Sequence, residues 1–310
     1  MSGYDIIGDV HGQADKLHSL LAILGYQEEL GVYRHASRQA VFVGDLIDRG
    51  PKIQEVLETA RKMVDDGAAL AVMGNHELNA ILFHTRDASG KPLRAHTPEK
   101  VRQHAATLEQ VVTKSADTWS DWLEWFKTLP FFLELGGLRI VHACWDQIAV
   151  DLVANRTLRD REFLLEVGAN QTPAAGALDL LLKGPELNLP AGAKWHDKDG
   201  HERTTMRTRW YAKPDPNVEY SYRDLALPSL DCLPDTLADP SFCNAIEGYS
   251  PEAVPVLFGH YWLPPGRPAL LASNVACLDY SAGKDGPLVA YRWDGERILN
   301  QDKFVPSAAI

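Results

Sequence analysis

The sequence predicts an α/β fold, and two observations lead to this prediction. Three short apolar segments occur in the first quarter of the chain, at residues 4–7 (YDII), 40–43 (AVFV) and 69–73 (ALAVM). Each is followed by a polar cluster that contains glycine and then by a pattern typical of a helix. A strand, loop and helix unit repeated in this way builds a parallel sheet, because the helix returns the chain to the starting edge.

The middle of the chain predicts a helix and then a hairpin. A polar stretch at 85–104 is followed by large apolar residues at spacings of three and four, namely Leu108, Val111, Val112, Trp119, Trp122, Trp125 and Phe126. This spacing favours a buried helix face, with a base-stacking platform as a weaker alternative. The segments 131–135 (FFLEL) and 138–142 (LRIVH) then flank two glycines, which predicts a hairpin with His142 at its end.

The last third of the chain is harder to interpret. We expect a helix at 178–182 that ends at the GPE sequence, 184–186, and a turn at 197–202 (DKDGHE), which does not match the full pattern of a calcium loop. Residues 256–300 predict successive strands: VLF, LLA, ACLDY, PLVAYRW and RILN. Asp294 and Gly295 between the last two are typical of a two-residue hairpin turn.

Composition narrows the class of protein. The chain has 310 residues and a net charge of -11, which argues against a nucleic-acid-binding surface because such surfaces need basic patches. Its four cysteines form no CxxC pair, which favours reduced thiols. No segment has the roughly 20 apolar residues of a membrane span, and the N-terminus does not resemble a signal sequence. We therefore expect a cytoplasmic protein without a membrane partner.

Polar residues of the types that bind metals follow five of the predicted strands. They are Asp9 and His11 in GDVHG, Asp45 and Asp48 in GDLIDRG, Asn75 and His76 in GNHE, His142 in VHA, and His260 in GH. One such cluster alone is typical of a turn or of an ordinary histidine. Clusters at the carboxyl ends of neighbouring strands, however, converge on one crevice of an open sheet. Their oxygen and nitrogen atoms suffice for two divalent cations, so the sequence predicts a hydrolytic two-metal site.

The order and wording of these clusters resemble the calcineurin-like metallophosphoesterase family. The resemblance is to its phosphoprotein-phosphatase branch with the related bacterial serine/threonine phosphatases and dinucleoside polyphosphatases. It is close over residues 1 to about 80 and continues only as His142 and His260. It implies one domain over 1–310, in which two mixed β-sheets pack as a central sandwich flanked by helices and the strands at 256–300 close the second sheet. Residues 150–225 are expected to form an insertion or cap-like segment.

The metal ligands implied by the resemblance form two sets that share one carboxylate. They are Asp9 and His11 for the first metal, Asn75, His142 and His260 for the second, and Asp45 as the bridge between the two. A bridging carboxylate holds two cations at a spacing at which both polarise one water and both touch the phosphate. Such ligands suit Mn²⁺, which we expect, but also Fe and Zn²⁺.

Three further residues are implied in catalysis. A hydroxide between the metals would attack the phosphorus, and His76 would act as general acid at the leaving-group oxygen. Asp48 would orient the His76 ring and favour its protonated form, and Arg49 would bind a phosphate oxygen. The alternatives without catalysis are a helix cap for Asp48 and a solvated loop position for Arg49. Glu77 is interpreted as structural.

The substrate is a phosphorylated molecule of one of two classes. We place first a phosphomonoester, as for a bacterial-type serine/threonine protein phosphatase, and second the anhydride of a dinucleoside polyphosphate. The sequence departs from the phosphoprotein-phosphatase pattern at Ala143–Cys144 and Tyr261–Trp262, and aromatic residues suit a base better than a peptide. A catalytically inactive metal-binding regulatory module is the alternative from another class.

Two arginines in the segment RTTMRTRWY are candidates for a second phosphate contact. Arg207 and Arg209 would share one face of a strand, and Trp210 or Tyr211 would contact the rest of the substrate. A solvated strand face with Trp210 in the core is an equally good interpretation. Tyr261 is the third candidate for substrate binding.

Overall fold

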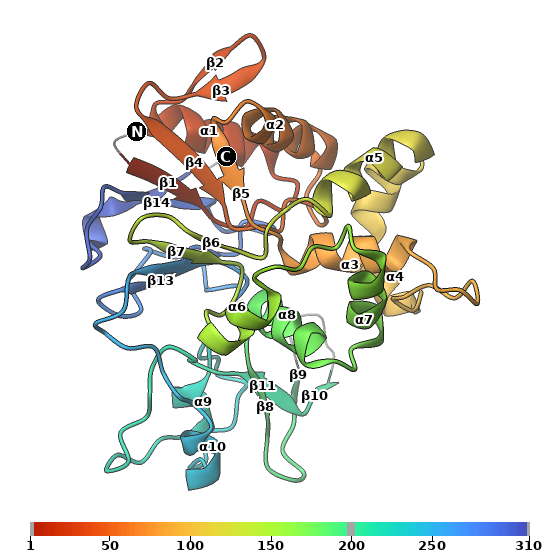
Figure 1. Cartoon of the computed structure of the whole chain (residues 1–310). Coiled ribbons are helices and arrows are strands. Elements are labelled where there is room, and N and C mark those ends of the chain that lie inside the picture. The colour runs from red at the N-terminus through yellow and green to blue at the C-terminus, as the bar shows by residue number, and fades with distance from the viewer. Residues whose placement is uncertain (1–2, 197–201, 309–310) are drawn as a thin grey trace.

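Two mixed β-sheets lie at the centre of the computed structural model, which describes residues 3–196 and 202–308 (Figure 1). The first sheet has the order β15 (Phe304–Pro306), β14 (Val289–Trp293), β1 (Gly3–Ile7), β4 (Arg38–Phe42) and β5 (Ala69–Ala71). The second has the order β13 (Val275–Cys277), β12 (Val256–Phe258), β7 (Arg139–Val141) and β6 (Phe132–Glu134). Both sheets combine parallel and antiparallel pairs, which confirms the predicted fold class.

The three predicted N-terminal strands form the parallel part of the first sheet. β1 pairs with β4, and β4 pairs with β5, so their carboxyl ends meet at one edge. One continuous apolar core includes Ile7 and Phe42 from this sheet and Ile140 and Phe258 from the second. These four side chains are completely buried, as expected for strands that are covered on both faces.

Helices surround the two sheets. They are α1 (Ala14–Leu24), α2 (Ile53–Asp65), α3 (Asn75–His84), α4 (Pro98–Thr107), α5 (Ala116–Phe126), α6 (Gln147–Val153), α7 (Arg161–Ala169), α8 (Pro173–Lys183), α9 (Tyr222–Leu225) and α10 (Pro240–Asn244). A π-helical turn, Leu108–Val112, joins α4 to α5, and a 3-10 turn, Gln301–Lys303, precedes β15. The tryptophans of α5 are buried in the main core, as the spacing predicted. No helix in the described ranges is long and apolar enough to cross a bilayer.

A second, smaller core lies between β7 and β12 in the sequence. It contains Leu189, Met206, Tyr222, Leu225, Ala226, Leu233, Phe242 and Ile246. Its strands are β8 (Glu186–Asn188) with β11 (Thr205–Arg207), next to β9 (Trp195–His196) with β10 (Glu202–Arg203). In contrast, α6, α7 and α8 pack on the main core. The expected segment at 150–225 therefore includes helices of the main body and only the first part of this second core, which continues to Ile246. Residues 197–201 of the expected turn lie outside the described residues.

The C-terminal strands differ from the prediction. β14 pairs with β1 and β15 pairs with β14, so both extend the first sheet instead of closing the second. Asp294 and Gly295 do not form a two-residue hairpin turn, because the chain runs from 294 to 303 before β15 begins. Within RILN, the N–H of Leu299 donates to the carbonyl of Ser273, which lies outside the strands. The LLA segment makes only an isolated bridge, between Ala272 and Val275.

A buried ion-pair cluster explains how the first strand accommodates a charged residue. The side chain of Asp5 is completely buried in β1. Its carboxylate accepts from Arg38 Nε at 2.9 Å and from Arg292 Nε at 2.9 Å, and these arginines come from β4 and β14. Because a buried carboxylate is costly unless it is paired, the two arginines compensate its charge and link three strands. We call these three residues the Asp5 cluster.

The small hairpin β2 (Gln27–Glu29) and β3 (Val32–Arg34) follows α1 at the outside of the first sheet (Figure 1). All four cysteines are free, in agreement with the expectation of reduced thiols.

Candidate active site

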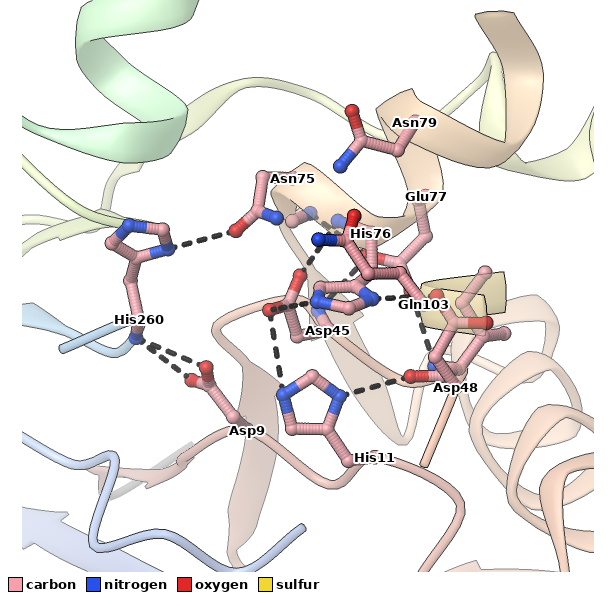
Figure 2. A network of polar contacts seen from close by, with 12 residues as sticks. Asp9, His11, Asp45, Asp48, Asn75, His76, Glu77, Asn79, Gln103 and His260 are labelled. Carbon is pink, nitrogen blue, oxygen red and sulfur yellow. Dashed lines mark hydrogen bonds and ion pairs between the residues drawn. The ribbon is translucent and has the colours of Figure 1, made fainter. Parts of the chain in front are cut away.

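The five polar clusters meet at the carboxyl ends of the strands, and Figure 2 labels residues from the clusters at Asp9, Asp45, Asn75 and His260. Asp9 and His11 follow β1, the 45–49 segment follows β4, and Asn75 follows β5. His142 and His260 follow the parallel strands β7 and β12 of the second sheet. The site therefore lies where the edges of the two sheets face each other, as the strand positions predicted.

Left-handed backbone conformations are concentrated at this site. Of the nine described non-glycine residues with positive φ, six lie in the clusters or directly beside them: His11, Asp45, Asp48, Arg49, His260 and Trp262. This conformation costs free energy for a residue that has a Cβ atom, and it persists where the surroundings impose it. Here it turns successive side chains toward one point after each strand ends.

One group of metal-ligand types is formed by Asp45, Asn75, His142 and His260. His142 Nδ1 lies 2.7 Å from the carbonyl of Val43, so that Nε2 faces the site. His142 Nε2 is 3.4 Å from Asp45 Oδ1 and 3.1 Å from Asn75 Oδ1. His260 Nδ1 is 2.7 Å from the same Asn75 oxygen. These atoms are close enough to surround a single cation.

A second group is formed around His11 and shares Asp45 with the first. His11 Nδ1 lies 2.9 Å from the carbonyl of Ile47, and His11 Nε2 is 3.6 Å from Asp45 Oδ2. Ligand atoms of His11, Asp45 and His76 lie within 4.8 Å of one another, as do those of Asp45, His142 and His260. Asp9 lies beside both groups and accepts the N–H of His260 at 3.0 Å. The position of Asp45 between the groups supports its predicted bridging role.

The charges and free lone pairs of the site fit divalent cations. Burial and the nearby Asp279 carboxylate raise the pKa of Asp9 well above its usual value. Burial lowers the pKa of His11 to about 3, so the ring is neutral and its Nε2 offers a lone pair. The buried Nε2 atoms of His11 and His260 have no hydrogen-bond partner. A cation bound here would accept the lone pair of an unpaired histidine nitrogen, and its charge would offset the repulsion between the carboxylates.

The candidate general acid His76 is paired with Asp48. His76 Nδ1 lies 2.6 Å from Asp48 Oδ2, and both side chains are buried. Although burial lowers the pKa of His76, the carboxylates of Asp45 and Asp48 raise it overall. Because Nδ1 donates to Asp48, the protonated ring has its second N–H, at Nε2, available on the Asp45 side.

Two residues that the sequence did not reveal hold Asp48 in place. His104 Nδ1 lies 2.8 Å from Asp48 Oδ1, and the Thr107 hydroxyl donates to the same oxygen at 2.5 Å. The backbone N–H of Asp48 donates to Thr107 Oγ1 at 3.1 Å. Both residues belong to α4 and are buried. The sequence predicted only a polar stretch at 85–104, so the single signal is that these two polar residues lie three positions apart, just before the predicted helix face.

Glu77 fixes the loop that carries the shared carboxylate. Its buried side chain accepts the N–H groups of Asp45 at 2.9 Å, Leu46 at 2.8 Å and Gly74 at 3.0 Å. These contacts satisfy backbone donors that would otherwise be buried without partners. They agree with the structural interpretation of this residue.

Arg49 lies at the open side of the site. Its side chain is exposed, and its guanidinium carbon lies 4.2 Å from the ring centre of Trp262. The Trp262 ring is in turn 5.3 Å from the ring of His11. Stacking on an indole orients a guanidinium without using its hydrogen-bond donors.

The candidate substrate-binding residues are placed differently from one another. Arg207 is the last residue of β11. Burial is the largest cause of the lowered pKa of His260 and the charge of Arg207 is the second largest, which indicates that Arg207 lies near the site. Arg209 lies beyond the strand and donates to the carbonyl of Ala226 at 3.2 Å, so the two arginines do not share a strand face. Tyr261 is completely buried, with its ring against Phe258, and offers no surface to a substrate. Trp210 and Tyr211 are also part of the main core.

Comparison with known proteins gives one family and several relatives. Residues 4–232 match the calcineurin-like phosphoesterase family model. The chain is 32% identical over 164 residues to the asymmetrical bis(5'-nucleosyl)-tetraphosphatase PrpE of Oceanobacillus iheyensis, covering 52% of this chain and 62% of that protein. It is 35% identical over 167 residues to the Bacillus subtilis protein of the same name, covering 52% and 64%. The alignments thus cover less than two thirds of either relative.

A solved structure shares the fold. A protein serine/threonine phosphatase from Saccharomyces cerevisiae superposes with a TM-score of 0.50 at 14% identity, over 99% of this chain and 80% of that one. At this identity the likeness concerns the arrangement of the chain and not the substrate.

Proposed function

The chain belongs to the calcineurin-like phosphoesterase family, and on this premise we propose that it hydrolyses the phosphoanhydride bonds of dinucleoside polyphosphates at a two-metal site. The observation that carries the proposal is the sharing of Asp45 by two buried groups of ligand atoms, with the His76–Asp48 pair directly beside them. The names of the relatives support the substrate class and reverse the order in which the sequence placed the two classes.

The predicted ligand sets, Asp9 with His11 and Asn75 with His142 and His260, would hold the two cations with Asp45 between them. We expect both cations to be Mn²⁺. When bound, they would supply Lewis-acid stabilisation of the phosphoryl oxygens and would acidify a water molecule.

The His76–Asp48 pair would protonate the leaving group. Nδ1 of His76 faces Asp48, so its proton stays in that hydrogen bond and the Nε2 proton is the one available for transfer. The ionised Asp48 keeps the ring charged until the bond to the leaving oxygen breaks. After transfer the ring is neutral and regains its proton from water.

Arg49 and Trp262 would bind the substrate at the open side. The guanidinium of Arg49, held against the indole, retains its N–H groups for a phosphoryl oxygen. A planar nucleobase at this edge has an aromatic surface to contact, which a phosphoserine side chain would not use.

Arg207 is proposed as an additional phosphate contact. Its Nε lies 3.6 Å from Glu186 Oε1, so its charge is partly compensated and yet acts on His260. We expect Arg207→Ala to lower kcat/KM by about tenfold, the size of a charged hydrogen bond. Arg209→Ala is the matched control, because that guanidinium is used at Ala226. Equal effects of the two substitutions would contradict the contact.

The substrate class is tested by direct competition. Metal-stripped protein is supplied with Mn²⁺, and kcat/KM is measured for diadenosine tetraphosphate, a phosphoserine peptide and p-nitrophenyl phosphate. We expect preference for the dinucleotide by about two orders of magnitude or more, and chromatography of the products distinguishes ATP plus AMP from two ADP.

Other outcomes would assign a different function. Preference for the peptide would identify a protein phosphatase. If the protein binds two metals and hydrolyses none of the three substrates, it would be a metal-binding regulatory module instead.

A further inference from the structure

Arg94 is a partly buried arginine whose guanidinium bonds to uncharged side chains. Its Nη1 donates to the amide oxygen of Asn79 at 2.6 Å, and its Nη2 donates to the amide oxygen of Gln103 at 2.9 Å. Among the described residues, no carboxylate forms an ion pair with it. Gln103 links Arg94 to Glu99, because the amide nitrogen of Gln103 donates to the Glu99 carboxylate at 3.3 Å.

The position of Arg94 follows from its two partners. Asn79 lies one turn after His76 on α3, on the same face of that helix. Gln103 lies one turn before Thr107 on α4, and Thr107 holds Asp48. Figure 2 shows Asn79 and Gln103 on the side of His76 and Asp48, away from His260. Arg94 therefore lies on the side of the site that holds His76 and Asp48, and the charge of Asp48 acts on its guanidinium.

The surroundings make Arg94 rigid and leave it able to bind an anion. The N–H of Arg94 donates to the carbonyl of Leu82, and the N–H of Leu93 donates to the carbonyl of Thr85, so this loop is fixed to the end of α3. Burial lowers the pKa of Arg94, and Asp48 and Glu99 oppose that effect through space. A guanidinium with fixed orientation and unused N–H groups is well suited to phosphate oxygens.

The two substrate classes differ at this point of the molecule. In a phosphomonoester, the leaving oxygen is attached to carbon, and the leaving group carries no charge next to it. In a phosphoanhydride, the leaving oxygen is attached to a second phosphorus, whose oxygens carry negative charge. A positive group that contacts those oxygens would therefore stabilise the second kind of leaving group more than the first.

We propose that Arg94 binds the phosphate on the leaving-group side of the scissile bond and so selects phosphoanhydrides over phosphomonoesters. This inference rests on the proposed function and adds to it the residue that would set its specificity. During cleavage, a water oxygen gives up a proton and forms a bond to the attacked phosphorus while the bond from that phosphorus to the bridging oxygen breaks. His76 protonates the bridging oxygen, and Arg94 remains bonded to the departing phosphate until it is released.

The test compares two substrates in three variants. Arg94→Ala and Arg94→Gln are compared with Arg86→Ala, an exposed arginine on the same loop whose guanidinium donates to the carbonyl of Gly90. We expect either Arg94 variant to lower kcat/KM for diadenosine tetraphosphate by about 10- to 100-fold, as for a charged hydrogen bond. The change for p-nitrophenyl phosphate should stay within about threefold, and Arg86→Ala should change neither.

A binding measurement separates this inference from the proposed function. Calorimetry with the Mn²⁺-loaded protein should show that Arg94→Gln weakens inorganic pyrophosphate by about tenfold or more and leaves orthophosphate unchanged. If the wild-type protein does not hydrolyse the dinucleotide but this difference appears, the substrate proposal fails and the role of Arg94 stands. Equal losses on both substrates, or unchanged pyrophosphate binding, would show that Arg94 only fastens the loop to α3 and α4.

Discussion

The Asp5 cluster and the candidate active site contain buried carboxylates in the middle of one strand and just after its carboxyl end. Asp5 lies within β1 and Asp9 follows its carboxyl end. Asp5 is paired with Arg38 and Arg292, which carry permanent charges. Within the described ranges, the only hydrogen-bond donor to the Asp9 carboxylate is the backbone N–H of His260, and Asp9 lies among other carboxylates and histidines.

The difference shows how a binding site for cations can be distinguished from a structural ion pair. Around Asp5 the charge is compensated within the chain, so the cluster is complete without a ligand. Around Asp9 and Asp45 the potential partners are histidines, whose charge depends on protonation. The negative charge at this end of the strand is therefore available to metal ions.

The largest effect should come from removing the shared carboxylate. Asp45→Asn keeps an oxygen for the N–H of His76, at present 2.9 Å away, but loses the negative charge between the two donor groups. We expect kcat/KM to fall by about 10³- to 10⁴-fold, because the stabilisation by two metals is worth several kcal/mol. Metal analysis after dialysis against Mn²⁺ should show fewer than two ions per chain. Two retained ions with nearly normal activity would contradict the bridging role.

The corresponding substitution within β1, Asp5→Asn, should affect stability instead of activity. Asp5→Asn leaves Arg38 and Arg292 without their buried counter-charge, and we expect the free energy of unfolding to fall by about 3–5 kcal/mol. Urea denaturation measures this loss, and kcat/KM at 25 °C should remain close to that of the wild type. The control is Asp15→Asn, whose exposed pair with Lys52 should matter by less than about 1 kcal/mol. A loss no larger than in the control would refute the comparison.

A smaller effect should distinguish a positioning residue from a structural one. His104→Ala removes one donor from Asp48 while Thr107 keeps the other, so the His76 ring should be less well oriented. We expect kcat to fall by about tenfold for phenyl phosphate, a poor leaving group, and little for p-nitrophenyl phosphate. His104→Asn, which can donate from its amide, should recover part of the loss.

His76→Ala provides the reference for the same leaving-group dependence. It should retain the metals while lowering kcat by about 10²- to 10⁴-fold for the poor leaving group. If the metals are lost, His76 is a ligand. If His104→Ala lowers both substrates equally, His104 serves the fold alone.

The smallest effect concerns pH and the histidine next to His104. His84 Nε2 lies 3.2 Å from His104 Nε2, and burial, followed by His104 and His96, lowers the pKa of His84 to about 4. In the unfolded chain this pKa is about 6.5, so below that pH the unfolded state binds a proton that the folded state excludes. His84 therefore does not lower the free energy of unfolding above pH 6.5, and it lowers that free energy progressively as the pH falls toward 4. In urea unfolding, His84→Gln should reduce that decline by about 1 kcal/mol, and an unchanged pH slope would disprove it.

The positions of the candidate ligands could be predicted from the sequence because each follows a recognisable strand, while their roles as ligands stay predictions. Asp9, Asp45 and Asn75 come directly after apolar segments, and the carboxyl ends of parallel strands are adjacent in any such sheet. The same reasoning placed His142 and His260. The residues that approach the site from other elements could not be identified from the sequence alone.

His104, Thr107 and Arg94 are examples of such residues. They lie on α4 and the loop before it, and they reach the site only through the packing of α4 against the loop after β4. The start of α4 was not predicted, because 85–104 was interpreted only as a polar stretch, although Thr97 caps this helix and Pro98 follows. Nothing local shows which helix face meets Asp48. Arg209 was misplaced for a similar reason, because β11 ends at Arg207.

The pairing of β1 with β14 has a consequence for synthesis of the protein. Asp5 and Arg292 are neighbours in the first sheet although 287 positions separate them. Ribosomes release the chain from its N-terminus, so β1 can pair early with β4 but lacks its second neighbour, β14, until nearly all other strands have emerged. The set of candidate metal ligands is likewise incomplete until His260 appears. Closing so long a loop is slow. We expect ribosome-bound chains truncated before residue 260 to remain sensitive to protease, which pulse proteolysis would measure.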